Sequence, residues 1–159
     1  MDDATATAAN PLTSGFGDSL EPQPCTLVIF GGSGDLTRRK LLPALYNLQL
    51  DGVLPASFAV LGFARSELDD AEFRTWARTG VEEFSRRPIE DDDWSDFARR
   101  LYFLAGSFGD EATAKRLLAR LGEIESAHGV PANRVFYLAI PPSLIRKCVA
   151  QLSDRKSVV

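Results

Sequence analysis

The sequence predicts an α/β protein with a Rossmann-like, doubly wound parallel sheet. Short apolar runs alternate along the chain with longer segments of helical periodicity. Connections of that length favour parallel strands joined by right-handed crossovers, with helices on both faces of the sheet. A glycine-rich stretch also follows the first apolar run directly. With 159 residues, 45% of them hydrophobic, the chain has the size of one domain with a substantial core.

Each strand is predicted from a short run of apolar residues. The expected strands are 26–30, 58–63, 101–104 and 135–140. The expected helices are 36–50, a helix after Leu68, a short helix around 94–98, one that begins at Asp110, and 143–152 with Ser143 as its cap. Ser66 and Asp69 have the spacing of a capping box, and Pro43 should kink the first helix or confine its regular part.

The first 24 residues are predicted to form a disordered tail, because they are rich in Ala, Thr, Ser, Gly and Pro and carry only acidic charge. The first basic residue of the chain is Arg38, whereas secretory and transit peptides need early positive charge. We therefore expect a cytoplasmic protein. No apolar run approaches the roughly 20 residues that a membrane helix requires. The folded domain is expected at 25–159.

The charge balance argues against a general nucleic-acid surface. Lys and Arg number 18 against 22 Asp and Glu, which gives a net charge of -4. A phosphate backbone needs a basic face, so any anion site in this chain must be local. The two cysteines, Cys25 and Cys148, lie far apart and without metal-site spacing, and we expect both to be free thiols.

The glycine-rich stretch comprises Gly31, Gly32, Ser33 and Gly34, between a predicted strand and a predicted helix. Glycine allows a tight turn and lets a phosphate approach the amides that open the helix, where the helix dipole also favours an anion. The match to the dinucleotide fingerprint is imperfect, because Thr37 stands where a third Gly or Ala belongs. A turn without a ligand remains the alternative interpretation.

Arg65 and Ser66 follow the second predicted strand, at the place where dinucleotide-binding folds contact the ribose. A carboxylate there favours NAD, whereas a guanidinium fits the 2′-phosphate of NADP. Arg65 therefore predicts NADP, the alternative being a solvated loop cation beside a helix cap. His128 is the one histidine, and Gly129 and Pro131 mark it as a surface residue at a helix end, unsuited to be a catalytic base.

The run FGGSGDLTRRKLLPALYNL closely resembles the amino-terminal nucleotide-binding signature of the glucose-6-phosphate dehydrogenase family. GFARSE and RVFYLAIPP resemble segments of the same family in the same order, so the resemblance extends over 26–152. It implies NADP as cofactor, glucose 6-phosphate as substrate, 6-phosphogluconolactone as product in the oxidative pentose phosphate pathway, and a homo-oligomer for the full-length enzyme.

The resemblance also implies particular contacts. Those expected to bind the pyrophosphate are Gly31, Gly32, Ser33, Gly34, Asp35, Leu36, Thr37 and Arg38. Those expected at the 2′-phosphate, the adenosine and the nicotinamide half are Arg65 with Ser66, Ser107 with Phe108, and Ala139 with Pro141 and Pro142. For the last three, the end of a strand without a ligand contact is the alternative. Lys40 matches a lysine between cofactor and sugar phosphate, with a solvated cation as the alternative. Ile145 departs from relatives that have a Tyr at its position.

Two catalytic segments of the family have no counterpart in these 159 residues: the lysine in Glu-Lys-Pro-Phe-Gly and the histidine base in Arg-Ile-Asp-His-Tyr. The resemblance thus implies an amino-terminal, cofactor-binding portion of the dehydrogenase, with its sheet apparently truncated, its substrate domain absent and no activity of its own. The alternative is a non-catalytic NADP-binding module with a sensing or interaction role.

Overall fold

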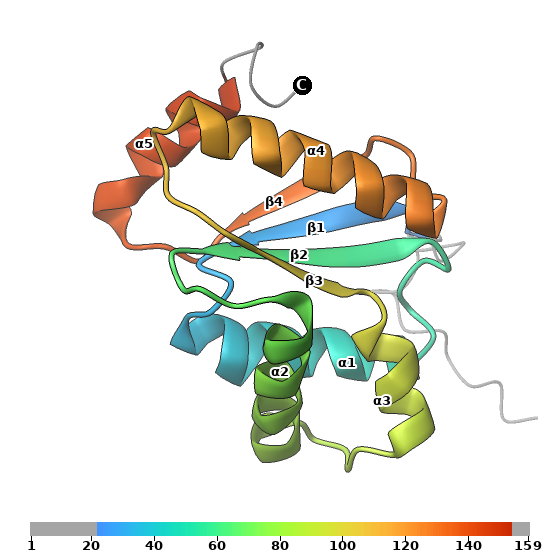
Figure 1. Cartoon of the computed structure of the whole chain (residues 1–159). Coiled ribbons are helices and arrows are strands. Elements are labelled where there is room, and N and C mark those ends of the chain that lie inside the picture. Colours follow the sequence, from blue (N-terminus) through green and yellow to red (C-terminus); the bar gives the residue numbers. More distant parts are fainter. Residues whose placement is uncertain (1–21, 154–159) are drawn as a thin grey trace, which may run out of the picture.

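The structure, a computed structural model, describes residues 22–153, so 1–21 of the predicted tail and 154–159 lie outside the described residues. A parallel sheet lies between two layers of helices (Figure 1). Its strands are β1 (Cys25–Phe30), β2 (Phe58–Ala64), β3 (Leu101–Ala105) and β4 (Arg134–Leu138). The helices are the π-helical turn η1 (Thr37–Leu41), α1 (Leu42–Leu50), α2 (Asp70–Phe84), α3 (Asp91–Ala98), α4 (Glu111–His128) and α5 (Pro142–Ser153).

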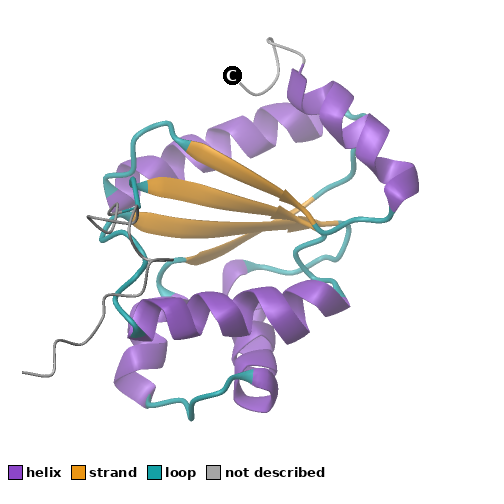
Figure 2. Ribbon diagram, turned by 180° about the vertical axis from the view of Figure 1, so that it is seen from behind, coloured by secondary structure: helices purple, strands orange, loops and turns teal. Residues whose placement is uncertain are grey.

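The strand order is β3-β2-β1-β4, and every neighbouring pair is parallel. The chain builds outward from β1 to β3 on one side and then crosses to place β4 on the other side of β1. Helices α1, α2 and α3 cover one face of the sheet, and α4 and α5 cover the other (Figures 1 and 2). This arrangement confirms the doubly wound prediction and puts the switch point between β1 and β4.

Alternate residues of β1, β2 and β3 supply the cores on the two faces of the sheet, while β4 contributes to the α4–α5 face alone. On the α1–α3 face, Tyr46 is fully buried and packs its ring against Trp94 and Phe97. On the α4–α5 face, Phe30 and Phe63 meet edge to face with ring centroids 5.4 Å apart. Because both faces are covered, β1 and β2 read as continuous apolar runs in the sequence.

Pro43 explains why the first helix begins irregularly. A proline cannot donate the backbone hydrogen bond that a regular helix needs at that position. The preceding turn widens into η1, in which the Leu42 amide reaches back to the carbonyl oxygen of Thr37, and the regular α-helix begins only at Leu42. The prediction that Pro43 confines the regular helix is confirmed.

Three local predictions are wrong in detail. The capping box of α2 is formed by Asp69 and Glu72, because Asp69 is the extended residue before the helix while Ser66 lies back in the loop. Strand β4 ends at Leu138, two residues early, since the prolines that follow turn the chain out of the sheet. Helix α5 starts at Pro142, whose fixed φ suits the first helical position, so Ser143 lies within the helix.

The two edges of the sheet differ. Along edge strand β3, side chains of α2 form hydrogen bonds with backbone groups. Asp70 accepts from the Phe103 amide at 2.8 Å, and Arg74 donates to the Leu101 carbonyl at 3.0 Å. Edge strand β4 instead presents Val135 and Tyr137, which are 48% and 42% exposed. Exposed apolar side chains on an edge strand are typical of a surface that another element covers.

Neither Cys25 nor Cys148 forms a disulfide, as predicted. Burial raises the pKa of the Cys148 thiol to about 11, so it is protonated and unreactive at neutral pH. Within residues 22–153, no helix combines the length and the apolar character needed to cross a membrane.

Candidate nucleotide-binding site

A pocket of about 450 Å³ lies at the carboxyl ends of the strands. Nine of the residues predicted to bind the cofactor line it: Gly31, Ser33, Gly34, Arg65, Ser66, Ser107, Phe108, Ala139 and Pro141. Six further lining residues were not predicted: Phe63, Ala64, Gly106, Ile140, Leu144 and Lys147. The pocket thus brings together residues from four turns that are far apart in the sequence.

The turn after β1 is held by bonds within the protein. The amides of Gly31 and Gly32 both donate to the carbonyl of Phe63, at 2.9 and 3.1 Å, and the amide of Gly34 donates to Gly31 at 2.9 Å. These three amides are therefore engaged without a ligand. An anion at this turn would have to be met by the amides that open the following helix, which lack acceptors inside it.

Two glycines of the turn are required by packing. A Cβ on Gly31, whose φ is +87°, would lie 2.1 Å from the carbonyl oxygen of Ala139. A Cβ on Gly32 would lie 2.6 Å from the Cα of Gly62. Gly34 is less confined, with 3.1 Å from such a Cβ to the Gly31 oxygen. The first two glycines let β4 and β2 approach the turn, and this approach shapes the pocket floor.

Thr37 has a structural part in this turn. Its side chain is fully buried, and its hydroxyl donates to the carbonyl oxygen of Gly31 at 2.9 Å. The residue that departs from the dinucleotide fingerprint therefore ties the first helical turn back to the end of β1. Asp35 and Leu36, also predicted at the pyrophosphate, are exposed and do not line the pocket.

The three basic residues that follow the glycine turn do not line the pocket. Arg38 forms an ion pair with Glu83 of α2 at 2.9 Å, and Gly80 permits this approach, since a Cβ there would lie 2.7 Å from the Arg38 side chain. Arg39 pairs with Asp35 at 3.6 Å. Lys40 is exposed and does not line the pocket. Neither Arg38 nor Lys40 thus contacts the pocket in this conformation.

Arg65 and Ser66 lie on the exposed turn after β2 and line the pocket. The hydroxyls of Ser66 and Ser33 lie 2.7 Å apart, so the turns after β1 and β2 are joined across the pocket wall. No salt bridge within residues 22–153 engages Arg65, which leaves its guanidinium available to an anion.

The remaining wall of the pocket comes from the segments that follow the two edge strands, β3 and β4. Ser107 and Phe108 lie on the β3–α4 connection, and the Phe108 ring packs 5.3 Å from that of Phe30. Ala139 and Pro141 come directly after β4, whereas Pro142 has entered α5 and does not line the pocket. Lys147 was missed by the sequence reasoning. The sequence signal that could have found it is the three-residue spacing of Leu144 and Lys147, which places both on one face of α5 just after Pro141.

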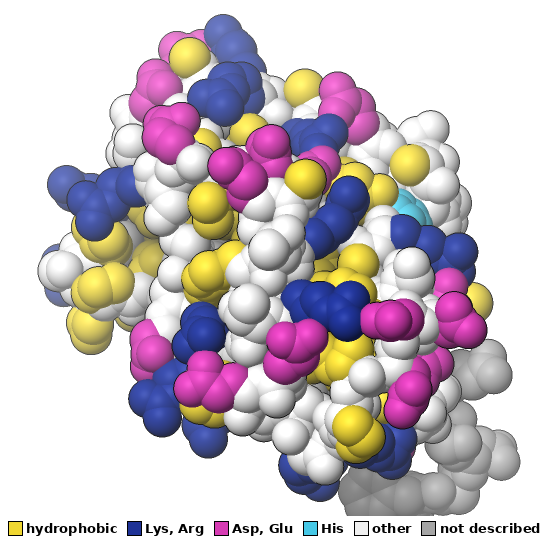
Figure 3. All heavy atoms as spheres, turned by 60° about the horizontal axis from the view of Figure 1, so that its bottom comes forward, with side chains coloured by type: hydrophobic (Ala, Val, Ile, Leu, Met, Phe, Trp, Pro, Cys, Tyr) yellow, Lys and Arg dark blue, Asp and Glu magenta, His cyan; other side chains and the backbone are white. Residues whose placement is uncertain are grey.

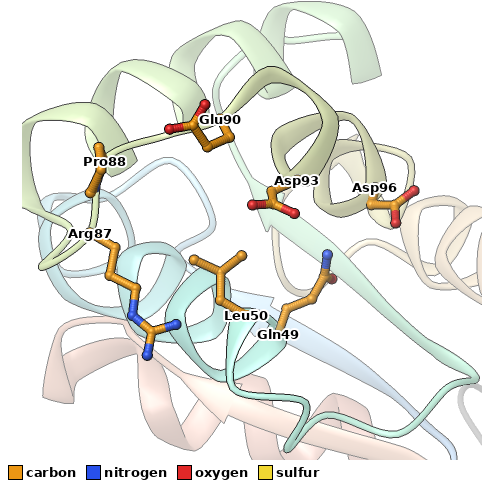
Figure 4. A pocket seen from close by; sticks show the side chains of 7 residues that line it. All are labelled: Gln49, Leu50, Arg87, Pro88, Glu90, Asp93 and Asp96. Carbon is orange, nitrogen blue, oxygen red and sulfur yellow. The ribbon is translucent and has the colours of Figure 1, made fainter.

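A second hollow, of about 510 Å³, lies between the carboxyl end of α1 and helix α3 (Figure 4). Three carboxylates line it, those of Glu90, Asp93 and Asp96, while Arg87 on its rim is paired with Asp51. Walls of this charge repel a phosphate-bearing ligand. Acidic and basic side chains are otherwise interspersed over the face in Figure 3. No group of metal-ligating side chains occurs among the residues that the structure describes.

His128 is the last residue of α4, as predicted, but it is partly buried. Its Nε2 lies 2.7 Å from the hydroxyl oxygen of Tyr102, at the start of β3. Burial, followed by the nearby charges of Arg100 and Arg99, lowers the pKa of His128. Helix α4 runs away from the carboxyl ends of the strands (Figure 1). The contact with Tyr102, near the amino end of β3, therefore puts His128 at the opposite end of the sheet from the pocket.

The parallel sheet, the switch point beside β1 and the glycine turn at the pocket define a dinucleotide-binding domain of the Rossmann class. Comparison with known families narrows this class. The family described as "Glucose-6-phosphate dehydrogenase, NAD binding domain" matches residues 28–159. The chain therefore belongs to the glucose-6-phosphate dehydrogenase family, in the part that binds the nicotinamide dinucleotide.

Individual relatives agree with this assignment. The chain is 38% identical over 133 residues to a glucose-6-phosphate 1-dehydrogenase of Chlamydia pneumoniae, and the match covers 84% of this chain and 26% of the relative. It is also 38% identical over 119 residues to glucose-6-phosphate 1-dehydrogenase 2 of Mycobacterium tuberculosis, covering 75% of this chain and 23% of that protein. The chain thus spans about a quarter of the length of these curated relatives.

Solved structures show the same relationship. One is described as glucose-6-phosphate dehydrogenase in complex with its substrate glucose-6-phosphate, and it matches with a TM-score of 0.72 and 29% identity over 86% of this chain and 28% of its own. The enzyme from Mycobacterium avium matches with a TM-score of 0.69 and 27% identity, covering 84% of this chain and 27% of its own.

Proposed function

We propose that this chain is the NADP-binding portion of a glucose-6-phosphate dehydrogenase. The observation that carries the cofactor choice is the position of Arg65. It follows the second strand and lines the pocket with the glycine turn, without a salt bridge to any described carboxylate. A guanidinium at this position offers a fork of donors to a 2′-phosphate, whereas NAD-binding folds have a carboxylate there.

The pocket suits such a ligand. Its volume of about 450 Å³ falls within the range of small-molecule and cofactor sites, roughly 300–1,000 Å³. The proposed contacts follow the strand order. Arg65 and Ser66 bind the 2′-phosphate, Ser107 and Phe108 lie against the adenosine, the glycine turn and the start of the helix bind the pyrophosphate, and Ala139 with Pro141 border the nicotinamide half.

NADP, when bound, supplies a hydride acceptor. This portion of the enzyme would bind and orient it, and the base and substrate-binding groups would come from segments that have no counterpart in these 159 residues. The substrate is glucose 6-phosphate by relationship to the neighbour solved with that sugar phosphate. Lys40, exposed on the π-helical turn η1 that follows the glycine turn, is free to contact it. We further propose a cytoplasmic location and a homo-oligomer for the complete enzyme.

Calorimetric titration of the 159-residue chain with NADP and with NAD tests the cofactor choice. Arg65→Ala removes a charge-assisted interaction and should weaken NADP binding by roughly ten- to a hundredfold. NAD binding should hardly change, because NAD has no phosphate at that position. Arg65→Glu should repel NADP further while offering an acceptor to the 2′-hydroxyl of NAD.

Arg86→Ala serves as the matched control, since Arg86 is exposed on the α2–α3 loop and does not line the pocket. It should leave both affinities unchanged. Equal weakening of NADP and NAD by Arg65→Ala would show that Arg65 supports the fold or contacts a shared part of the cofactor. The preference for NADP would then have to be withdrawn.

A further inference from the structure

The nucleotide pocket has a second cation, and it comes from the opposite side of the glycine turn. Lys147 lies in the second turn of α5 and lines the pocket together with Leu144 and Pro141. Its side chain is exposed, and no salt bridge among the described residues engages it. Family resemblance had assigned this residue no contact.

The backbone around Lys147 is anchored. The next residue, Cys148, is fully buried against the α4–α5 core. One turn later, Gln151 accepts a hydrogen bond from the amide of Gly109 at 2.9 Å, which ties α5 to the β3–α4 connection. The point from which the Lys147 side chain extends is therefore fixed relative to the pocket, while its ammonium group remains free to move.

The strand order places the two pocket cations on different sides of β1. Arg65 follows β2, and α5 follows β4, while β1 with its glycine turn lies between those strands. A dinucleotide whose 2′-phosphate lies at Arg65 has its pyrophosphate over the glycine turn. Lys147 approaches that turn from the β4 side, away from Arg65.

The glycine turn offers the pyrophosphate few other partners. The amides of Gly31, Gly32 and Gly34 are already bonded within the protein, and Arg38 and Arg39 are paired with carboxylates. The Ser33 amide and the amides that open the helix would then have to balance two negative charges. A mobile ammonium that faces the same space is suited to this task, because lysine binds phosphate as a point charge.

We propose that Lys147 is a pyrophosphate-binding residue of this chain, one that serves NADP and NAD alike. The proposal rests on the proposed function, because it assumes that the pocket binds a dinucleotide. In this proposal the two cations have different roles. Arg65 selects the 2′-phosphate, and Lys147 contributes affinity that does not depend on that phosphate.

The test is a calorimetric titration of the wild-type chain, Lys147→Ala, Lys147→Arg and Arg146→Ala with NADP and with NAD. Lys147→Ala should weaken both nucleotides by the same factor, roughly five- to twentyfold, whereas Lys147→Arg should keep most of the affinity. The loss should also shrink as salt is added. Arg146→Ala is the matched control, since this adjacent cation is exposed and does not line the pocket.

Unchanged binding to Lys147→Ala, while the wild type binds both nucleotides, would overturn the role of Lys147 and leave the proposed function standing. A loss confined to NADP would overturn it too, because Lys147 would then contact the 2′-phosphate. Failure of the wild-type chain to bind either nucleotide, in a sample shown to be folded by circular dichroism, would instead remove the proposed function itself.

Discussion

The hydroxyl oxygens of Ser33 and Ser66 lie 2.7 Å apart, which joins the turns after β1 and β2 across the wall of the pocket at the carboxyl ends of the strands. The two residues are 33 positions apart, and each lies on a turn that contributes predicted ligand contacts. The bond is exposed to water, so its contribution to stability should be small, and its importance lies in fixing the distance between the glycine turn and Arg65.

A double-mutant cycle should detect this coupling. Ser33→Ala and Ser66→Ala should each lower the free energy of unfolding by less than about 1 kcal/mol, because water replaces an exposed partner readily. The double variant should lose less than the sum of the single losses, since one bond cannot be removed twice. Urea unfolding of the four proteins measures the coupling, and strictly additive losses would show that the two hydroxyls do not interact in solution.

Replacing Gly31 should be far more damaging than replacing Gly52. Both have positive φ, +87° and +67°, but a Cβ on Gly31 meets the Ala139 oxygen while one on Gly52 meets nothing within 4 Å. Gly52→Ala should therefore cost only the conformational penalty, about 1–2 kcal/mol. Gly31→Ala adds a backbone clash and should cost about 3 kcal/mol or more. Similar midpoints of thermal unfolding for the two variants would contradict the close approach of β4.

Stability should depend on pH through His128. Burial lowers the pKa of this imidazole in the folded protein, so the unfolded chain binds the proton more readily below its own pKa of about 6.5. The free energy of unfolding should then fall as pH drops from about 7 through the lower folded pKa. Above that window the group is neutral in both states and has no effect.

His128→Gln should flatten this dependence, because glutamine does not titrate. Urea unfolding of the wild type and the variant at several pH values between about 5 and 8 makes the comparison. A wild-type curve that stays level over this interval, or one that His128→Gln does not change, would show that burial at this site does not perturb the imidazole.

The 159-residue chain should show no turnover of glucose 6-phosphate with NADP. The family's catalytic lysine and histidine segments have no counterpart in it, and His128 contacts Tyr102 at the amino end of β3, far from the pocket. Acid–base catalysis requires a group within hydrogen-bond reach of the reacting hydroxyl. NADPH absorbance over time is the readout, with a full-length relative as the positive control. Turnover that His128→Asn abolished would overturn this account.

The order of the elements could be predicted because hydrophobic periodicity is a local signal. Short stretches of sequence were enough to predict the strands and helices, the irregular start of the first helix at Pro43 and the helix cap at Asp110. Local signals failed where two neighbouring patterns competed. Asp69, and not Ser66, is the N-cap of α2, and α5 begins at Pro142, one residue before the predicted cap Ser143.

The sequence by itself determined the fold class, the position of the glycine turn and the cation at the end of the second strand. Tertiary structure decided which of the predicted side chains reach the pocket and which further ones join them. Arg38 is turned away by Glu83, 45 residues later, and Lys147 is brought in by the crossover that places β4 beside β1. The physical reason is that a site at a switch point is assembled from several loops whose distances depend on strand order, and strand order is fixed only when distant apolar faces pack.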